Sequence, residues 1–91
     1  MKNEQLLQHL KDLAHKLQIT VVEHSFRNAG VPVKSGPCRI KGENYFILDK
    51  NVKVNIKISE LAEYLADRPL EDIYLLPAVR EALDRHSEPT P

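Results

Sequence analysis

The sequence has few of the residues that mark a specialised class of protein: one cysteine, no tryptophan and no excess of charge of either sign. A single cysteine cannot form an internal disulfide, so we expect a cytoplasmic protein in a reducing environment. No apolar run approaches the roughly 20 residues that span a bilayer, and the opening "MKNEQLLQHL" has no apolar signal-peptide core. We therefore expect neither secretion nor contact with a membrane.

The length of 91 residues suits one modest domain. We expect a single α+β domain over residues 1–87 and a frayed tail over residues 88–91. Size scaling indicates that such a chain buries about 64% of its extended-chain surface, and an enclosed cleft of about 300 Å³ or more would remove much of that core. The sequence therefore predicts neither a deep active site within one chain nor a cofactor.

Charge is balanced overall but is unevenly distributed along the chain. Residues 27–57 contain seven basic and two acidic side chains, whereas residues 58–91 contain three basic and eight acidic ones. Such segregation can orient a partner or a second copy through complementary fields. Alternatively, the two segments neutralise each other within the fold.

The first third of the chain predicts a helix followed by a strand and a loop. Asn3 is expected to cap a helix whose apolar residues recur every three to four positions. The β-branched run that begins at Ile19 favours a strand to about His24. The glycines and prolines of residues 25–37 indicate a loop, with at most an edge strand over residues 31–34.

The stretch "CRIKGENYFIL" predicts a β-hairpin with Gly42 and Glu43 as a type II′ turn. Alternation along the two strands gives two faces: Cys38, Ile40, Tyr45 and Ile47 on one, and Arg39, Lys41, Phe46 and Leu48 on the other. We expect the first face to pack on helices, with Cys38 as a small core residue.

The last part of the chain predicts two further helices. The first is expected to begin near Val54 and to end before Pro69, and the second to begin at Pro77, a residue that the first helical turn tolerates well. The fold class is therefore α+β, with three helices packed on a small, mostly antiparallel sheet of three to four strands.

The order of these elements, with the hairpin "SGPCRIKGENYFILDKN" and a helix soon after it, resembles the N-terminal half of the ImmA/IrrE family of zinc metallopeptidases over residues 10–67. In that family the corresponding helix carries His-Glu-x-x-His. The resemblance places the two zinc histidines on Glu63 and Asp67 and the general-base glutamate on Tyr64. Two carboxylates replace two imidazoles and the base is lost, so the resemblance implies a zincin-like half that is not a zinc peptidase.

Two groups of residues are candidates for chemistry, and each also has a purely structural interpretation. Cys38 stands beside basic residues that favour a thiolate, and His24 is the one histidine expected to approach it. Free cysteine, however, is more often a small buried hydrophobe. Glu63 and Asp67 have the oxygen atoms that hard divalent cations prefer, yet carboxylates at this spacing usually form a solvated helix surface. We expect no catalytic residue and no metal.

The basic middle of the chain is the candidate binding surface, and it consists of Arg27, Lys34, Arg39, Lys41, Lys50, Lys53 and Lys57. We expect a small non-catalytic module that binds itself, as a homodimer or larger homo-oligomer, or a partner protein, by pairing the basic hairpin with the acidic last third of the chain. Two alternatives remain at this point: a nucleic-acid-binding module that uses the basic hairpin, and a Cys38-dependent enzyme.

Overall fold

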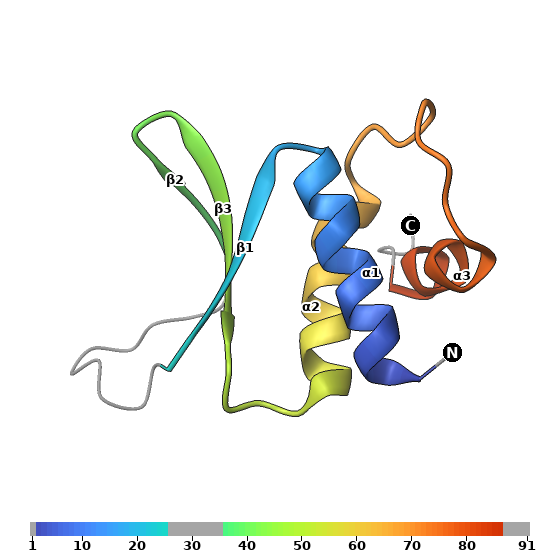
Figure 1. Cartoon of the computed structure of the whole chain (residues 1–91), viewed down its shortest axis with the longest axis horizontal. Helices are drawn as coiled ribbons and strands as arrows, with labels where there is room; N and C mark the ends of the chain where they lie inside the picture. Colours follow the sequence, from blue (N-terminus) through green and yellow to red (C-terminus); the bar gives the residue numbers. More distant parts are fainter. Residues whose placement is uncertain (1, 26–35, 87–91) are drawn as a thin grey trace, which may run out of the picture.

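The computed structural model describes residues 2–25 and 36–86. Its elements, in chain order, are α1 (Asn3–Lys16), β1 (Ile19–His24), β2 (Gly36–Ile40), β3 (Glu43–Asp49), α2 (Val54–Ala66) and α3 (Pro77–His86). The fold is α+β, as predicted: a three-stranded sheet lies beside α1 and α2, and α3 lies on the far side of these two helices (Figure 1). No described helix is long and apolar enough to cross a membrane.

The sheet has the order β1-β3-β2 and is mixed. β2 runs antiparallel to β3, whereas β1 runs parallel to it. The expectation of a mostly antiparallel sheet was therefore wrong for one of the two strand pairs. The possible edge strand over residues 31–34 lies outside the described residues, and so does the predicted tail over residues 88–91.

The helices cover the face of the sheet opposite to the one that we predicted. Phe46 and Leu48 are buried in the core, and the Phe46 ring lies 4.8 Å from the ring of Tyr64 on α2. Ile19 and Val21 of β1 are in register with Asn44 and Phe46, so they lie on the same covered face. The two faces were divided correctly, but the larger apolar side chains of β1 and β3 determine which one is buried. Cys38 is accordingly only half-buried and lies outside the core.

The hairpin turn lies one residue earlier than predicted. Ile40 pairs with Glu43, so Lys41 and Gly42 form the loop. Both have positive φ, 51° and 83° respectively, which defines a type I′ turn rather than type II′. The backbone of a type I′ turn matches the right-handed twist of the flanking strands. Gly42 adopts the left-handed conformation that this turn requires without steric cost.

The helices begin and end close to their predicted positions. α2 begins at Val54 and α3 at Pro77, as expected, but Asn3 is the first residue of α1 and Lys2 precedes it as the N-cap. α1 ends without a glycine: Gln18 adopts the left-handed conformation, with φ of 64°, directly before β1. Leucine, isoleucine, valine and alanine side chains from all three helices form the core with the covered face of the sheet.

One charged cluster ties β1 to both of the helices that cover the sheet. The Glu23 carboxylate accepts hydrogen bonds from Lys11 Nζ of α1 at 2.7 Å and pairs with Lys57 Nζ of α2 at 2.5 Å. The hydrogen bond from Lys11 has the largest effect on the pKa of Glu23 and that from Lys57 the next largest, and both hold this pKa below its ordinary value.

Candidate interaction surface

The sheet face that none of the described helices covers is the candidate site, and we call it the outer sheet face. Strand alternation and register place nine side chains there: Thr20, Val22 and His24 of β1, Cys38 and Ile40 of β2, and Glu43, Tyr45, Ile47 and Asp49 of β3. In Figure 1 this face is turned away from α1 and α2. It differs from an ordinary solvated sheet face because its middle is largely apolar.

Exposure of large apolar side chains is concentrated on this face. Ile40 is 48% exposed and Val22 is 38% exposed, and these are two of the four exposed large hydrophobic residues in the described part of the chain. Val22 is in register with Ile47 across the parallel β1–β3 pair. Parallel pairs in soluble proteins are usually covered on both faces, so an apolar outer face on such a pair is unusual.

Carboxylates lie at both ends of the outer sheet face, and a lysine follows one of them. Glu43 lies at the hairpin end, where it accepts a hydrogen bond from the Tyr45 hydroxyl at 3.1 Å, and this bond raises the pKa of Tyr45. At the other end, Asp49 accepts a hydrogen bond from the backbone N–H of Asn51 at 2.9 Å, and exposed Lys50 follows directly. An apolar middle thus lies between Glu43 at one end and Asp49 at the other, with exposed Lys50 next to Asp49.

The structure does not bring Cys38 and His24 together. Cys38 pairs with Tyr45 on one side of β3, whereas His24 pairs with Asp49 on the other side. Four residues of β3 separate these two positions, which corresponds to about 13 Å along the strand. A nucleophile and its general base must lie within hydrogen-bond distance, so this pair has no geometry for catalysis.

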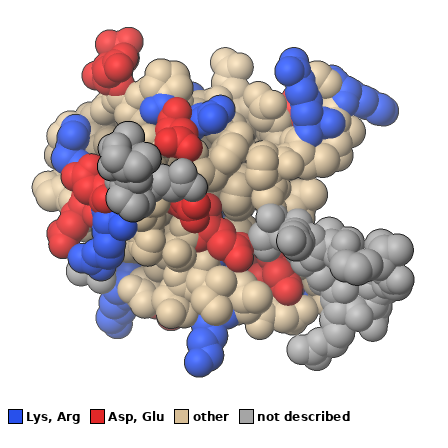
Figure 2. All heavy atoms as spheres, turned by 180° about the vertical axis from the view of Figure 1, so that it is seen from behind, with Lys and Arg blue, Asp and Glu red and all other residues tan. Residues whose placement is uncertain are grey.

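Glu63 and Asp67 lie on the exposed side of α2. They border a hollow of about 340 Å³ between α2 and the start of β2, together with Glu60 and Tyr64. Figure 2 shows a band of acidic side chains across the middle of the face seen from behind. Within residues 2–25 and 36–86, no three His, Cys, Asp or Glu side chains are grouped so that they could hold a metal ion.

The predicted basic surface is divided in this fold. Arg39 and Lys41 lie at the hairpin turn, while Lys50 and Lys53 lie at the opposite end of β3, about 20 Å away. Lys57 forms a salt bridge with Glu23. The remaining two members, Arg27 and Lys34, lie outside the described residues. The described basic side chains therefore do not form one continuous patch.

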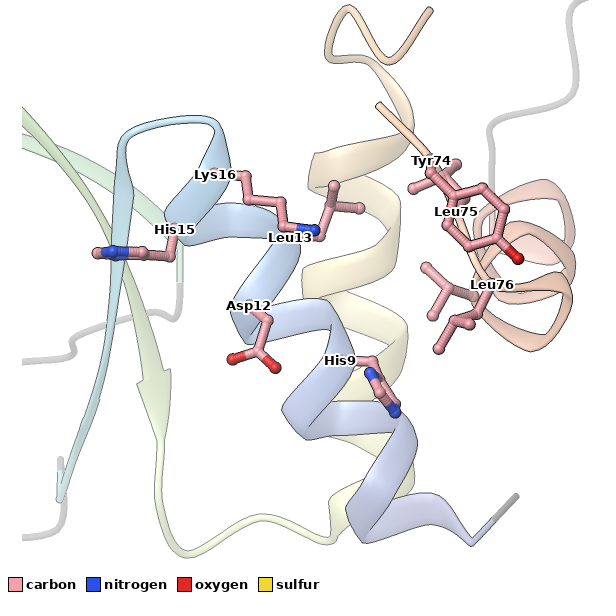
Figure 3. Close-up of a pocket in the computed structure, with 9 residues that line it drawn as sticks. His9, Asp12, Leu13, His15, Lys16, Tyr74, Leu75 and Leu76 are labelled. Carbon is pink, nitrogen blue, oxygen red and sulfur yellow. The ribbon is translucent and has the colours of Figure 1, made fainter. Parts of the chain in front are cut away.

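A groove separates α1 from the segment that leads into α3 (Figure 3). Its volume is about 500 Å³, and we call it the α1 groove; its walls are His9, Asp12, Leu13, His15 and Lys16 of α1, Tyr74, Leu75 and Leu76 of the connecting segment, and Val79 of α3. Sequence reasoning missed this groove, because nothing local in the sequence indicates that residues 74–76 return to α1.

Comparison with family models, curated proteins and solved structures gives no match to this chain. Its function must therefore be inferred from its own surfaces. Sequence reasoning also missed the outer sheet face, although one signal was present. Ile19 and Val21 alternate with Thr20 and Val22 in β1, and this alternation leaves an apolar residue on each side of the strand.

Proposed function

We propose that this chain is a cytoplasmic, non-catalytic interaction module that associates with a second copy of itself through the outer sheet face. The observation that carries the proposal is the exposure of Val22 beside half-buried Ile47, and of Ile40 at the hairpin end, on a face without a helix layer among the described residues. Burial of apolar side chains is the main driving force of such association, at about 25 cal/mol per Å² of surface removed from water.

The distribution of charge supports a second copy as the occupant. Two sheets can face each other about a two-fold axis that runs either along the strands or across them. An axis along the strands would place Glu43 against its own symmetry mate. An axis across the strands brings Glu43 of one copy to the end of the other copy where Lys50 follows Asp49, since Glu43 and Asp49 lie at opposite ends of β3. We propose the second arrangement, because it places a lysine beside the two carboxylates at each end of the apolar middle, whereas the first sets Glu43 against Glu43 alone.

The size of the surface sets the expected strength. Three strands about 4.8 Å apart and about six residues long cover roughly 14 Å by 20 Å, or about 280 Å². A stable interface buries about 800 Å² on each partner. The dimer is therefore weak, with a Kd on the order of 100 μM, and it has to be sought at high protein concentration.

Sedimentation equilibrium between about 10 μM and 1 mM tests the proposal. The variant Val22→Lys places an ammonium beside Ile47 on the outer sheet face and should raise the dimer Kd at least tenfold, because a charge buried without a partner is costly. Ile56→Lys is the matched control: Ile56 on α2 is 41% exposed against 38% for Val22, but it lies outside the outer sheet face. We expect the control to associate as the unchanged chain does.

Two results would overturn this proposal. One is a monomer at every concentration, and the other is association that both lysine variants weaken equally. Charge reversal then tests the orientation: Glu43→Lys should weaken the dimer, and Glu43→Lys combined with Lys50→Glu should restore part of the loss. Failure of this rescue would leave a face-to-face dimer but refute the axis across the strands.

We further propose that the scaffold is a degenerate zincin-like half, as the family resemblance implies. It is supported by the order of helix, strand, hairpin and helix, and by the carboxylates Glu63 and Asp67 where zinc histidines would stand. Calorimetric titration with Zn²⁺ should accordingly give no stoichiometric binding at micromolar concentrations, and tight binding to one site would contradict this account.

A further inference from the structure

The α1 groove has an apolar floor that is only partly covered. Leu13 and Val79 are buried beneath it, whereas Leu75 and Leu76 are half-buried and lie beside Tyr74, whose side chain is 78% exposed. Figure 3 shows Leu75 and Leu76 across the groove from α1, with the Tyr74 ring beside them on the connecting segment. The Tyr74 ring and the accessible parts of Leu75 and Leu76 offer contact area for an apolar group. The groove volume of about 500 Å³ lies in the range of small-molecule sites.

The α1 wall of the groove carries one cation, Lys16, and one carboxylate, Asp12. His9, Leu13 and Lys16 lie at helical spacing along one side of α1, with the Lys16 side chain above Leu13 (Figure 3). Neither His9 nor Lys16 has a hydrogen-bond or ion-pair partner within the described part of the chain. Asp12 is the one acidic residue of the groove, and its carboxylate accepts a hydrogen bond from Gln8 Nε2 at 3.0 Å.

The length of the groove limits the ligand. From His9 to Lys16 the helix rises about 10 Å, at 1.5 Å for each residue. A medium-chain acyl group or a single substituted ring fits this length, whereas a long-chain fatty acid would extend into solvent. A carboxylate at one end of such a ligand would meet Lys16, and its apolar part would lie on Leu75, Leu76 and the ring of Tyr74.

We infer that the α1 groove is a binding site for a small amphiphilic monocarboxylate, whose carboxylate is held by Lys16 and whose apolar part lies between α1 and residues 74–76. The site is separate from the outer sheet face, because α1 and α2 lie between the groove and the strands (Figure 1). Ligand binding and self-association can therefore be tested independently.

Titration of the full chain with octanoate, followed by ¹H–¹⁵N NMR, tests the inference. A ligand of about ten non-hydrogen atoms on an open site is expected to bind with a Kd of about 1 mM or below. The largest shifts should fall on the amides of His9, Leu13 and Leu75. Octylammonium, with the same apolar chain and the opposite charge, should bind at least fivefold more weakly.

Two exposed residues allow substitution without harm to the core. Lys16→Gln should weaken octanoate binding about fivefold, which corresponds to the loss of one exposed ion pair. Tyr74→Ser should weaken octanoate and octylammonium alike, because it removes apolar contact area. Lys2→Gln is the control, since Lys2 is the N-cap of α1 and lies outside the groove. Shifts confined to other regions, equal binding of both probes, or unchanged binding by Lys16→Gln would each overturn the inference.

Discussion

Removal of the Glu23 carboxylate is the sharpest test of how the sheet is held to the helices. Glu23 on β1 pairs with Lys11 of α1 and with Lys57 of α2, and the side chains of these three residues are 29%, 25% and 14% exposed. Fully exposed ion pairs contribute at most about 1 kcal/mol each, and solvent screens these partly covered pairs less. We therefore expect Glu23→Gln to lower the free energy of unfolding by about 1.5 kcal/mol.

Thermal unfolding followed by circular dichroism measures this change. In a domain of this size, 1 kcal/mol shifts Tm by about 4 to 8 °C, so Glu23→Gln should lower Tm by about 6 to 12 °C at neutral pH. Glu81→Gln is the matched control, because the Glu81–Arg85 pair has side chains that are 71% and 68% exposed. That substitution should change the free energy of unfolding by about 0.5 kcal/mol or less.

The pH dependence checks the electrostatic origin of the effect. Because the folded pKa of Glu23 lies below its ordinary value of 4.5, the stabilisation is fully present above that pH. It disappears as the pH falls through the folded pKa. The Tm difference between the unchanged chain and Glu23→Gln should therefore shrink in acid. A difference that persists undiminished at about pH 2, or equal Tm losses for Glu23→Gln and Glu81→Gln at neutral pH, would refute the reasoning.

Two further predictions concern backbone conformation and the thiol. Gln18 has a φ of 64°, so Gln18→Gly should raise the free energy of unfolding by about 0.5 to 1 kcal/mol in urea denaturation, while Gly42→Ala, at a φ of 83°, should lower it by about 1 kcal/mol. A loss of stability by Gln18→Gly would contradict this explanation. Cys38 is half-buried on the outer sheet face, so it should react with a thiol reagent in the native state, and more slowly as protein concentration rises through the dimer Kd. A concentration-independent rate would count against the proposed dimer.

Local signals in the sequence predict the individual elements well. The β-branched run predicts β1 to the residue, and Pro77 marks the first turn of α3, because each depends on residues next to it in the chain. The start of α2 at Val54 follows from helical spacing in the same way. Two local features were displaced by one residue: the cap of α1, since Asn3 enters the helix, and the hairpin turn, which consists of Lys41 and Gly42.

Contacts between distant residues explain the errors. The choice of the buried sheet face depends on Phe46 meeting Tyr64, a partner on another element, and no alternation pattern within the hairpin contains that information. The parallel pairing of β1 with β3 likewise joins residues far apart in the chain. The candidate Cys38–His24 pair failed for the same reason, because the register across three strands determines their separation.

The parallel pairing of β1 with β3 also has a consequence for the order in which the chain folds. β1 emerges from the ribosome before β3, its partner in the described sheet, because Asn44, which pairs with Ile19, lies 25 residues later in the chain. The β2–β3 hairpin, joined by a two-residue turn, closes locally and therefore fast. Until that hairpin exists, β1 has no template, and its apolar residues depend on α1 for cover. We expect the hairpin to form first and β1 to dock last. The edge of β3 that later pairs with β1 is therefore the part of the sheet at greatest risk of pairing with the wrong chain during synthesis.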